Sequence, residues 1–192
     1  MRVVPTSLPG VMLLEPKVHG DERGFFVEVF RAEWMAEVGI DRPFVQDNQS
    51  RSGRGVLRGL HFQLERPQGK LVRVNRGEIF DVAVDVRLGS PTFGHWYGAT
   101  LDDRAHRQLW VPPGFAHGFC VVSEMADVSY KCTEYYHPES ERGVAWNDPE
   151  IGITWPLTDV TLSKRDQANV GLHRFATTDL PRFATHPEPA TR

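Results

Sequence analysis

Residues 79–86, within the stretch EIFDVAVDVR (78–87), alternate between two kinds of side chain. The even-numbered positions are large and apolar, from Phe80 to Val86, whereas the odd-numbered positions include Asp81 and Asp85. A period of two is that of a β-strand, in which successive side chains point to opposite faces. The stretch therefore predicts a strand with one apolar face and one face that carries carboxylates.

The same alternation recurs along most of the chain. It is found at residues 70–75, 95–101, 107–112, 118–124 and 127–136. Glycine, proline and aspartate clusters separate these stretches and leave no room for crossover helices, so the sheet should be mainly antiparallel. We predict an all-β fold of the sandwich, jelly-roll or barrel type.

Two short helices are expected beside the strands. One covers residues 32–38, and the other begins near Ser163, where Ser163 to Asp166 resembles a capped first turn. We assign residues 1–178 to one domain and residues 179–192, rich in proline and polar residues, to a loose C-terminal tail.

Composition limits the class of protein. The 192 residues have a formal net charge of −3, which gives no broad electrostatic footprint for nucleic acid or anionic membrane. No run approaches the ~20 apolar residues of a membrane helix, and the N-terminus has no signal-peptide pattern. Cys120 and Cys132 lack metal or disulfide spacing, so we expect buried free thiols in a soluble cytoplasmic domain.

The stretch GVLRGLHFQ (55–63) places polar side chains in a strand that otherwise looks buried. Strand parity puts Gly59, His61 and Gln63 on one face, and Gln63 is expected to line the wall of a cavity. Arg58 belongs to the opposite face unless Gly59 forms a bulge, as glycine often does.

A second histidine, His117, follows the turn in WVPPGFAHGF (110–119). Two such histidines in an antiparallel barrel resemble the metal-site pattern of the cupin jelly roll. Here, however, Gln63 stands where the cupin pattern has its second histidine. The glutamate of that pattern is missing, and Lys70 lies near its position. A lysine ammonium repels a divalent cation. We therefore expect a site that binds an anion and transfers protons, with no metal.

A more specific resemblance covers about residues 1–178. The segments DERGFFVEVF, FVQDN, LRGLHFQ, QGKLVRV, WVPPGFAHGF, YKCTEYY and WNDPEIGITWP resemble, in order and spacing, the dTDP-4-dehydrorhamnose 3,5-epimerase family. The resemblance implies a metal-free, cofactor-independent jelly-roll homodimer. It also implies a substrate, dTDP-4-dehydro-6-deoxy-D-glucose, that is inverted at carbons 3 and 5 on the route to dTDP-L-rhamnose.

The resemblance assigns catalytic roles to four residues. His61 matches the general base, Asp166 the carboxylate that orients it, Tyr130 the acid and Lys70 the cation at the enolate oxygen. Without the resemblance, Asp166 reads as a surface residue of a helical turn. Tyr136 lies six residues after Tyr130 on one strand parity, so either tyrosine could be the acid; the motif favours Tyr130.

The resemblance also implies a set of substrate contacts. His117 would contact the sugar, and Asp81 could orient His117. The nucleotide contacts would be Arg23, Glu28, Gln46, Asp47, Asn48, Arg58, Glu141 and Arg165. Arg23 is expected to reach the site of the partner subunit in the dimer. For Arg23 and Glu28, the sequence alone favours plain surface charge.

Three other functions remain open at this point. One is a single-position epimerase of an antibiotic-sugar pathway, which would use the same base, acid and cation. Another is a non-catalytic sugar-nucleotide binding protein, against which the matched base and acid argue. The third is a metal-dependent cupin oxygenase or isomerase.

Overall fold

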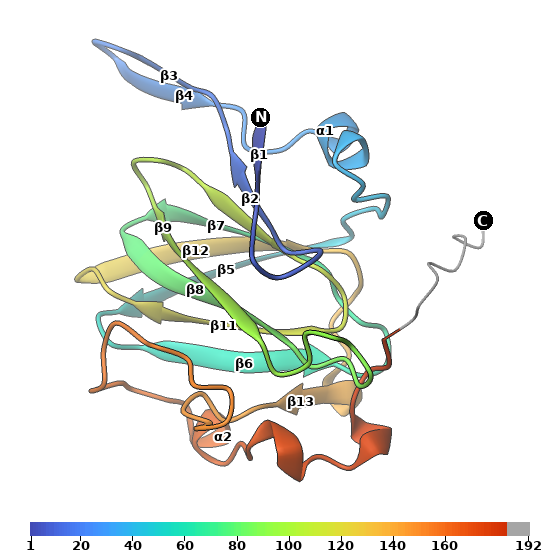
Figure 1. Ribbon diagram of the computed structural model, residues 1–192. Coiled ribbons are helices and arrows are strands. Elements are labelled where there is room, and N and C mark those ends of the chain that lie inside the picture. The colour runs from blue at the N-terminus through green and yellow to red at the C-terminus, as the bar shows by residue number, and fades with distance from the viewer. Residues whose placement is uncertain (184–192) are drawn as a thin grey trace.

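The computed structural model describes residues 1–183 as two antiparallel sheets packed face to face (Figure 1). The six-stranded sheet has the order β1 (Arg2–Pro5), β2 (Met12–Glu15), β10 (Gln108–Val111), β7 (Lys70–Arg76), β12 (Met125–Cys132) and β5 (Gln46–Gly53). The five-stranded sheet has the order β13 (Glu141–Gly143), β6 (Leu57–Gln63), β11 (Phe115–Val121), β8 (Glu78–Asp85) and β9 (Trp96–Asp102). The predicted all-β, cupin-like fold is confirmed.

Strand β8 shows how the alternation builds the layers. Its odd-numbered side chains, Ile79 and Ala83, lie in the core between the two sheets. Its even-numbered side chains, Val82 and Val84, lie on the outer face and are 0% exposed. Both faces of this strand are therefore buried.

The C-terminal third of the chain covers the outer face of the five-stranded sheet. Val144, Ile151, Leu172 and Leu180 pack there in one apolar cluster. This segment includes α2 (Lys164–Gln167) and three 3₁₀ turns, Pro138–Ser140, Leu172–Arg174 and Thr177–Asp179. The cover fixes α2 beside β6, which is important for the cavity described below.

A smaller layer covers part of the six-stranded sheet. The predicted helix is α1 (Ala32–Glu37), and its Met35 packs on Leu14, Leu71 and Trp110. A separate hairpin, β3 (Val18–Asp21) and β4 (Gly24–Val27), projects from the barrel (Figure 1). No helix in residues 1–183 is both long and apolar enough to cross a membrane.

Several predicted boundaries differ from the structure. Strand β12 ends at Cys132, so Tyr136 lies in the following connection and shares no strand parity with Tyr130. Strand β11 begins at Phe115, three residues before the predicted start. Cys120 and Cys132 are buried and free, as predicted.

The predicted loose tail also begins too early. Leu180 is buried, and Leu88 exchanges backbone hydrogen bonds with the carbonyl of Pro181 and the amide of Phe183, at 2.7 and 3.0 Å. Residues 179–183 are thus part of the domain, because Leu180 contributes to its outer core. Residues 184–192 lie outside the described part of the chain.

Candidate active site

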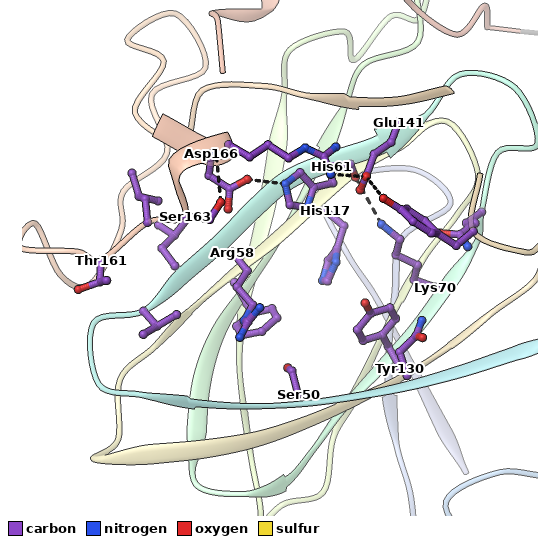
Figure 2. Close-up of a pocket in the computed structure, with 18 of the residues that line it drawn as sticks. Ser50, Arg58, His61, Lys70, His117, Tyr130, Glu141, Thr161, Ser163 and Asp166 are labelled. Carbon is purple, nitrogen blue, oxygen red and sulfur yellow. Dashed lines mark hydrogen bonds and ion pairs between the residues drawn. The ribbon is translucent and has the colours of Figure 1, made fainter. Parts of the chain in front are cut away.

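A cavity of about 660 Å³ is lined by strands of both sheets and by residues 161–166 (Figure 2). Ten of the thirteen predicted site residues line it. These are Gln46, Asn48, Arg58, His61, Lys70, His117, Tyr130, Glu141, Arg165 and Asp166.

A bulge in β6 brings Arg58 and His61 to the same cavity. His61 pairs with His117 of β11 and Arg58 pairs with Phe119, so two residues of β6, at 59 and 60, oppose one residue of β11, at 118. Gly59 has a φ of +122°, and a Cβ there would lie 2.6 Å from the Cα of Gly118. Glycine thus permits both the conformation and the close approach. The bulge foreseen as an alternative is the one the structure adopts.

His61 forms a short hydrogen bond with Asp166, 2.6 Å from Nε2 to Oδ1 (Figure 2). The amide of Leu57 donates to the carbonyl of Thr161 at 3.0 Å, which holds the start of α2 beside β6. Ser163 accepts from the amide of Asp166 at 3.0 Å as the N-cap of α2. His61 and Asp166, 105 residues apart in the chain, are thereby held side by side.

The carboxylate of Asp166 fixes the tautomer of His61. Burial disfavours its charged form, but hydrogen bonds from His61, Ser163 and Gly59 outweigh burial and lower the pKa of Asp166. An ionised carboxylate can only accept a hydrogen bond, so Nε2 of His61 carries the proton. The lone pair therefore resides on Nδ1, which can accept a proton.

Lys70 and Tyr130 come from the opposite sheet, on β7 and β12. Lys70 is 9% exposed, and its ammonium donates to the carbonyl of His61 at 3.4 Å (Figure 2). Burial lowers the pKa of Lys70, and nearby Cys132 and acidic groups only partly oppose that shift. Burial likewise raises the pKa of Tyr130, so the phenol keeps its proton.

His117 forms a second imidazole–carboxylate pair inside the barrel. Its Nε2 lies 2.7 Å from Oδ1 of Asp81, and Asp81 is 0% exposed. The rings of His117 and Tyr130 lie 6.4 Å apart between centroids. The predicted orientation of His117 by Asp81 is confirmed.

A polar triad also lines the cavity. The Tyr136 hydroxyl donates to Oε2 of Glu141 at 2.6 Å, and the Arg165 guanidinium lies 2.5 Å from the same oxygen. The hydrogen bond to Glu141 raises the pKa of Tyr136. Burial opposes the charge on Arg165, but its bonds to Glu141 and Tyr136 raise its pKa overall. The triad thus combines an aromatic ring, a cation and an acceptor.

Three predicted contacts do not line the cavity of this chain. Arg23 pairs with Asp21 on the projecting hairpin, and Glu28 pairs with Arg31 at 2.7 Å. Asp47 pairs with Lys131 at 2.8 Å. Asp47 occupies an odd-numbered position of β5 and points away, because the even-numbered Gln46 and Asn48 point inward.

Sequence reasoning missed other lining residues. Ser50 and Phe119 line the cavity and share strand parity with Asn48 and His117, so parity was a usable signal. Gln68 and residues 161–163 also line it, and no local pattern indicated them.

Gln63 was predicted to line the cavity wall, but the structure places it outside the wall. Its side chain bonds instead to the carbonyl of Arg66 and to the connection after β12. Within residues 1–183, no group of three or more His, Cys, Asp or Glu side chains could hold a metal ion. At the cupin metal positions this chain brings together two imidazoles and an ammonium, a poor donor set for a divalent cation.

The fold and the cavity define a cupin-like barrel with an acid–base site. Residues 5–174 match the family model described as dTDP-4-dehydrorhamnose 3,5-epimerase. The chain is 60% identical over 169 residues to a protein of that name from Neisseria gonorrhoeae, covering 88% of this chain and 52% of that protein. Its namesake from Methanothermobacter thermautotrophicus is 55% identical, with 86% of this chain and 91% of that protein covered.

A solved structure agrees with these sequence relatives. The epimerase RmlC from Legionella pneumophila, in complex with dTDP-4-keto-L-rhamnose, is 53% identical and superimposes with a TM-score of 0.94. The alignment covers 96% of this chain and 99% of that one. The chain therefore belongs to the dTDP-4-dehydrorhamnose 3,5-epimerase family, and the predicted resemblance is confirmed.

Proposed function

We propose that this enzyme inverts carbons 3 and 5 of dTDP-4-dehydro-6-deoxy-D-glucose without a cofactor, towards dTDP-L-rhamnose. One observation supports the proposal most strongly. The imidazole of His61, with its lone pair on Nδ1, faces the phenol of Tyr130 and the ammonium of Lys70 across the cavity. Base and acid thus come from opposite sheets.

The substrate's chemistry fits this arrangement. Carbons 3 and 5 both flank the ketone at carbon 4, so loss of either proton gives an enolate on the same oxygen. His61 takes the proton from carbon, and the electron pair moves to the carbonyl oxygen beside Lys70. Tyr130 then donates its proton to the other face of that carbon as the carbonyl re-forms. The tyrosinate regains a proton from solvent, and His61 releases one.

Different residues of the cavity wall suit different halves of the substrate. The sugar would lie by His61, Lys70 and His117, with Asp81 orienting His117. The diphosphate carries negative charge, which Arg58 and Arg165 would meet through paired N–H donors. Gln46, Asn48 and Glu141 would hydrogen-bond the nucleoside.

We further propose a homodimer in which the β3–β4 hairpin enters the partner's site. Phe25 and Phe26 on this hairpin are 61% and 70% exposed, and an isolated two-stranded hairpin is marginally stable in water. Burial against a second copy would stabilise it. Arg23 and Glu28 would then contact the nucleotide bound by the partner. Buried free thiols at Cys120 and Cys132 are consistent with a reducing cytoplasm.

Subunit mixing tests the shared site. Arg23→Ala and His61→Asn enzymes are each expected to be nearly inactive. After exchange of subunits, half the dimers are mixed and one site in each is intact, so about one quarter of wild-type activity should return. Absence of recovery, or a fully active monomer, would contradict the proposal.

The activity itself is tested by NMR of the sugar product. Inversion at both carbons is expected from the wild-type enzyme, and none from His61→Asn with unchanged affinity for dTDP. Inversion at one carbon would identify a single-position epimerase. Folded protein that binds dTDP and inverts neither carbon would be a binding protein.

A further inference from the structure

Residues 134–137 connect β12 to the turn before β13, and their Tyr136 lines the cavity. We call these residues the mouth segment. They belong to no helix or strand, and Tyr135 and Tyr136 are 58% and 48% exposed. Apolar burial therefore contributes little to their position. Three glutamine side chains bond their backbone, and we call them the glutamine clamp: Gln46, Gln63 and Gln68.

Gln63 makes the largest share of these bonds. Its Oε1 accepts from the amide of His137 at 2.9 Å, and its Nε2 donates to the carbonyl of Tyr135 at 3.3 Å. The same nitrogen donates to the carbonyl of Arg66 at 2.8 Å. At 4% exposure, Gln63 is shielded from water, so loss of its amide would leave these backbone groups unpaired.

The other two glutamines bond the remaining positions. Gln46 accepts from the amide of Tyr136 at 2.8 Å, and Gln68 donates to the carbonyl of Glu134 at 2.8 Å. Every residue of the mouth segment thus has a backbone group bonded to a glutamine side chain. Such side-chain partners replace the ladder that a strand would supply.

The clamp is built on the strands that form the catalytic walls. Each glutamine lies two residues from a cavity residue on the same strand or at its start, in the pairs Gln46 and Asn48, Gln63 and His61, and Gln68 and Lys70. The mouth segment is therefore fixed relative to the reacting groups.

We propose that the glutamine clamp positions Tyr136 and thereby sets the affinity for the nucleotide half of the substrate. Tyr136 lines the cavity and is joined to Glu141, which pairs with Arg165, and both of these residues are proposed above to contact the nucleotide half of the substrate. Gln63 is a positioning residue, because it acts through Tyr136. The identity of the ligand rests on the function proposed above.

Calorimetry with dTDP tests the inference in a double-mutant cycle. Gln63→Met should raise the Kd about tenfold, equivalent to ~1.4 kcal/mol, and leave kcat within about threefold. In a Tyr136→Ala background the same change should raise the Kd by less than about twofold, since the residue it acts through is absent. Gln49→Met, on the outer side of β5, is the control and should leave the Kd unchanged.

The outcomes separate the two proposals. Equal Kd increases in both backgrounds, or an unchanged Kd in Gln63→Met, would overturn the inference alone. If wild-type protein fails to bind dTDP, the proposed function fails and the inference with it. Should Gln63→Met not fold, Gln68→Met, which removes one bond to Glu134, decides by the same cycle. An increase in Kd in Gln68→Met that is smaller than tenfold and disappears in the Tyr136→Ala background supports the proposal. An unchanged Kd in Gln68→Met refutes it.

Discussion

Replacement of Asp166 by asparagine tests how His61 is made a base. The change keeps the shape of the side chain, and it keeps the helix cap because Ser163 accepts a hydrogen bond from the backbone amide of residue 166. The protein should therefore fold normally. What changes is the 2.6 Å contact with His61, which loses its ionised acceptor.

The expected magnitude follows from that contact. A hydrogen bond to a charged group contributes ~1.5–3 kcal/mol, which corresponds to about 10- to 150-fold in rate. The asparagine amide can also donate to Nε2 and so move the imidazole proton to Nδ1, which removes the base. Complete loss of a general base costs about 10²–10⁴-fold. We expect kcat to fall by about 10²–10³-fold, between these limits.

The assay compares turnover with binding. Substrate conversion followed by NMR gives kcat, and calorimetry gives the Kd of dTDP, which should stay within about twofold of wild type since no nucleotide contact changes. Asp159→Asn, an exposed carboxylate of the same segment, is the control. Wild-type kcat in Asp166→Asn, or a parallel loss of dTDP affinity, would refute the reasoning.

Three further predictions concern the opposite wall. Tyr130→Phe should lower the rate of inversion by about 10²–10⁴-fold. NMR should still detect exchange of substrate protons with solvent, because His61 can return a proton to the same face of the carbon. Loss of both inversion and exchange would contradict the assigned roles. Lys70→Met should lower kcat/KM by about 10²–10³-fold. It should also raise the Tm, because it removes a buried ammonium, and each kcal/mol of stability corresponds to ~2–4 °C. A lower Tm would contradict the second expectation. Burial lowers the pKa of Lys70 below its ordinary value of 10.5. The ammonium is therefore charged at low pH and loses its charge, as the pH rises, before the pH reaches 10.5. The decline of kcat on the alkaline side of the pH profile should therefore lie below pH 10.5, and it should move to higher pH in Lys70→Arg. If the decline does not move, it belongs to the titration of another group.

Much of the fold follows from local sequence. The alternation of β8 predicts its two faces because a side chain's direction in a strand depends only on position. What covers the outer face is not local. Val144 and Leu172 reach it through long-range packing, and the burial of Leu180 likewise depends on surfaces distant in sequence.

The site divides in the same way. His61 was predicted because it is a polar side chain in a strand that otherwise looks buried, and His117 because it follows a turn signal. Asp166 could be paired with His61 only through the family resemblance, because 105 residues separate them and only the folded cover brings α2 to β6. Gln63 was misplaced, because its inward parity was taken to mean contact with the cavity. Gln63 is the last residue of β6, and there its side chain bonds the mouth segment.

Deuterium incorporation into the product tests the central claim most directly. The enzyme would convert dTDP-4-dehydro-6-deoxy-D-glucose in heavy water, and NMR and mass measurement would locate deuterium in the product. If His61 and Tyr130 act as base and acid on a shared enolate oxygen, deuterium should appear at both carbons 3 and 5. Inverted product without solvent deuterium would contradict proton transfer through the enolate, and deuterium at a single carbon would contradict double epimerisation.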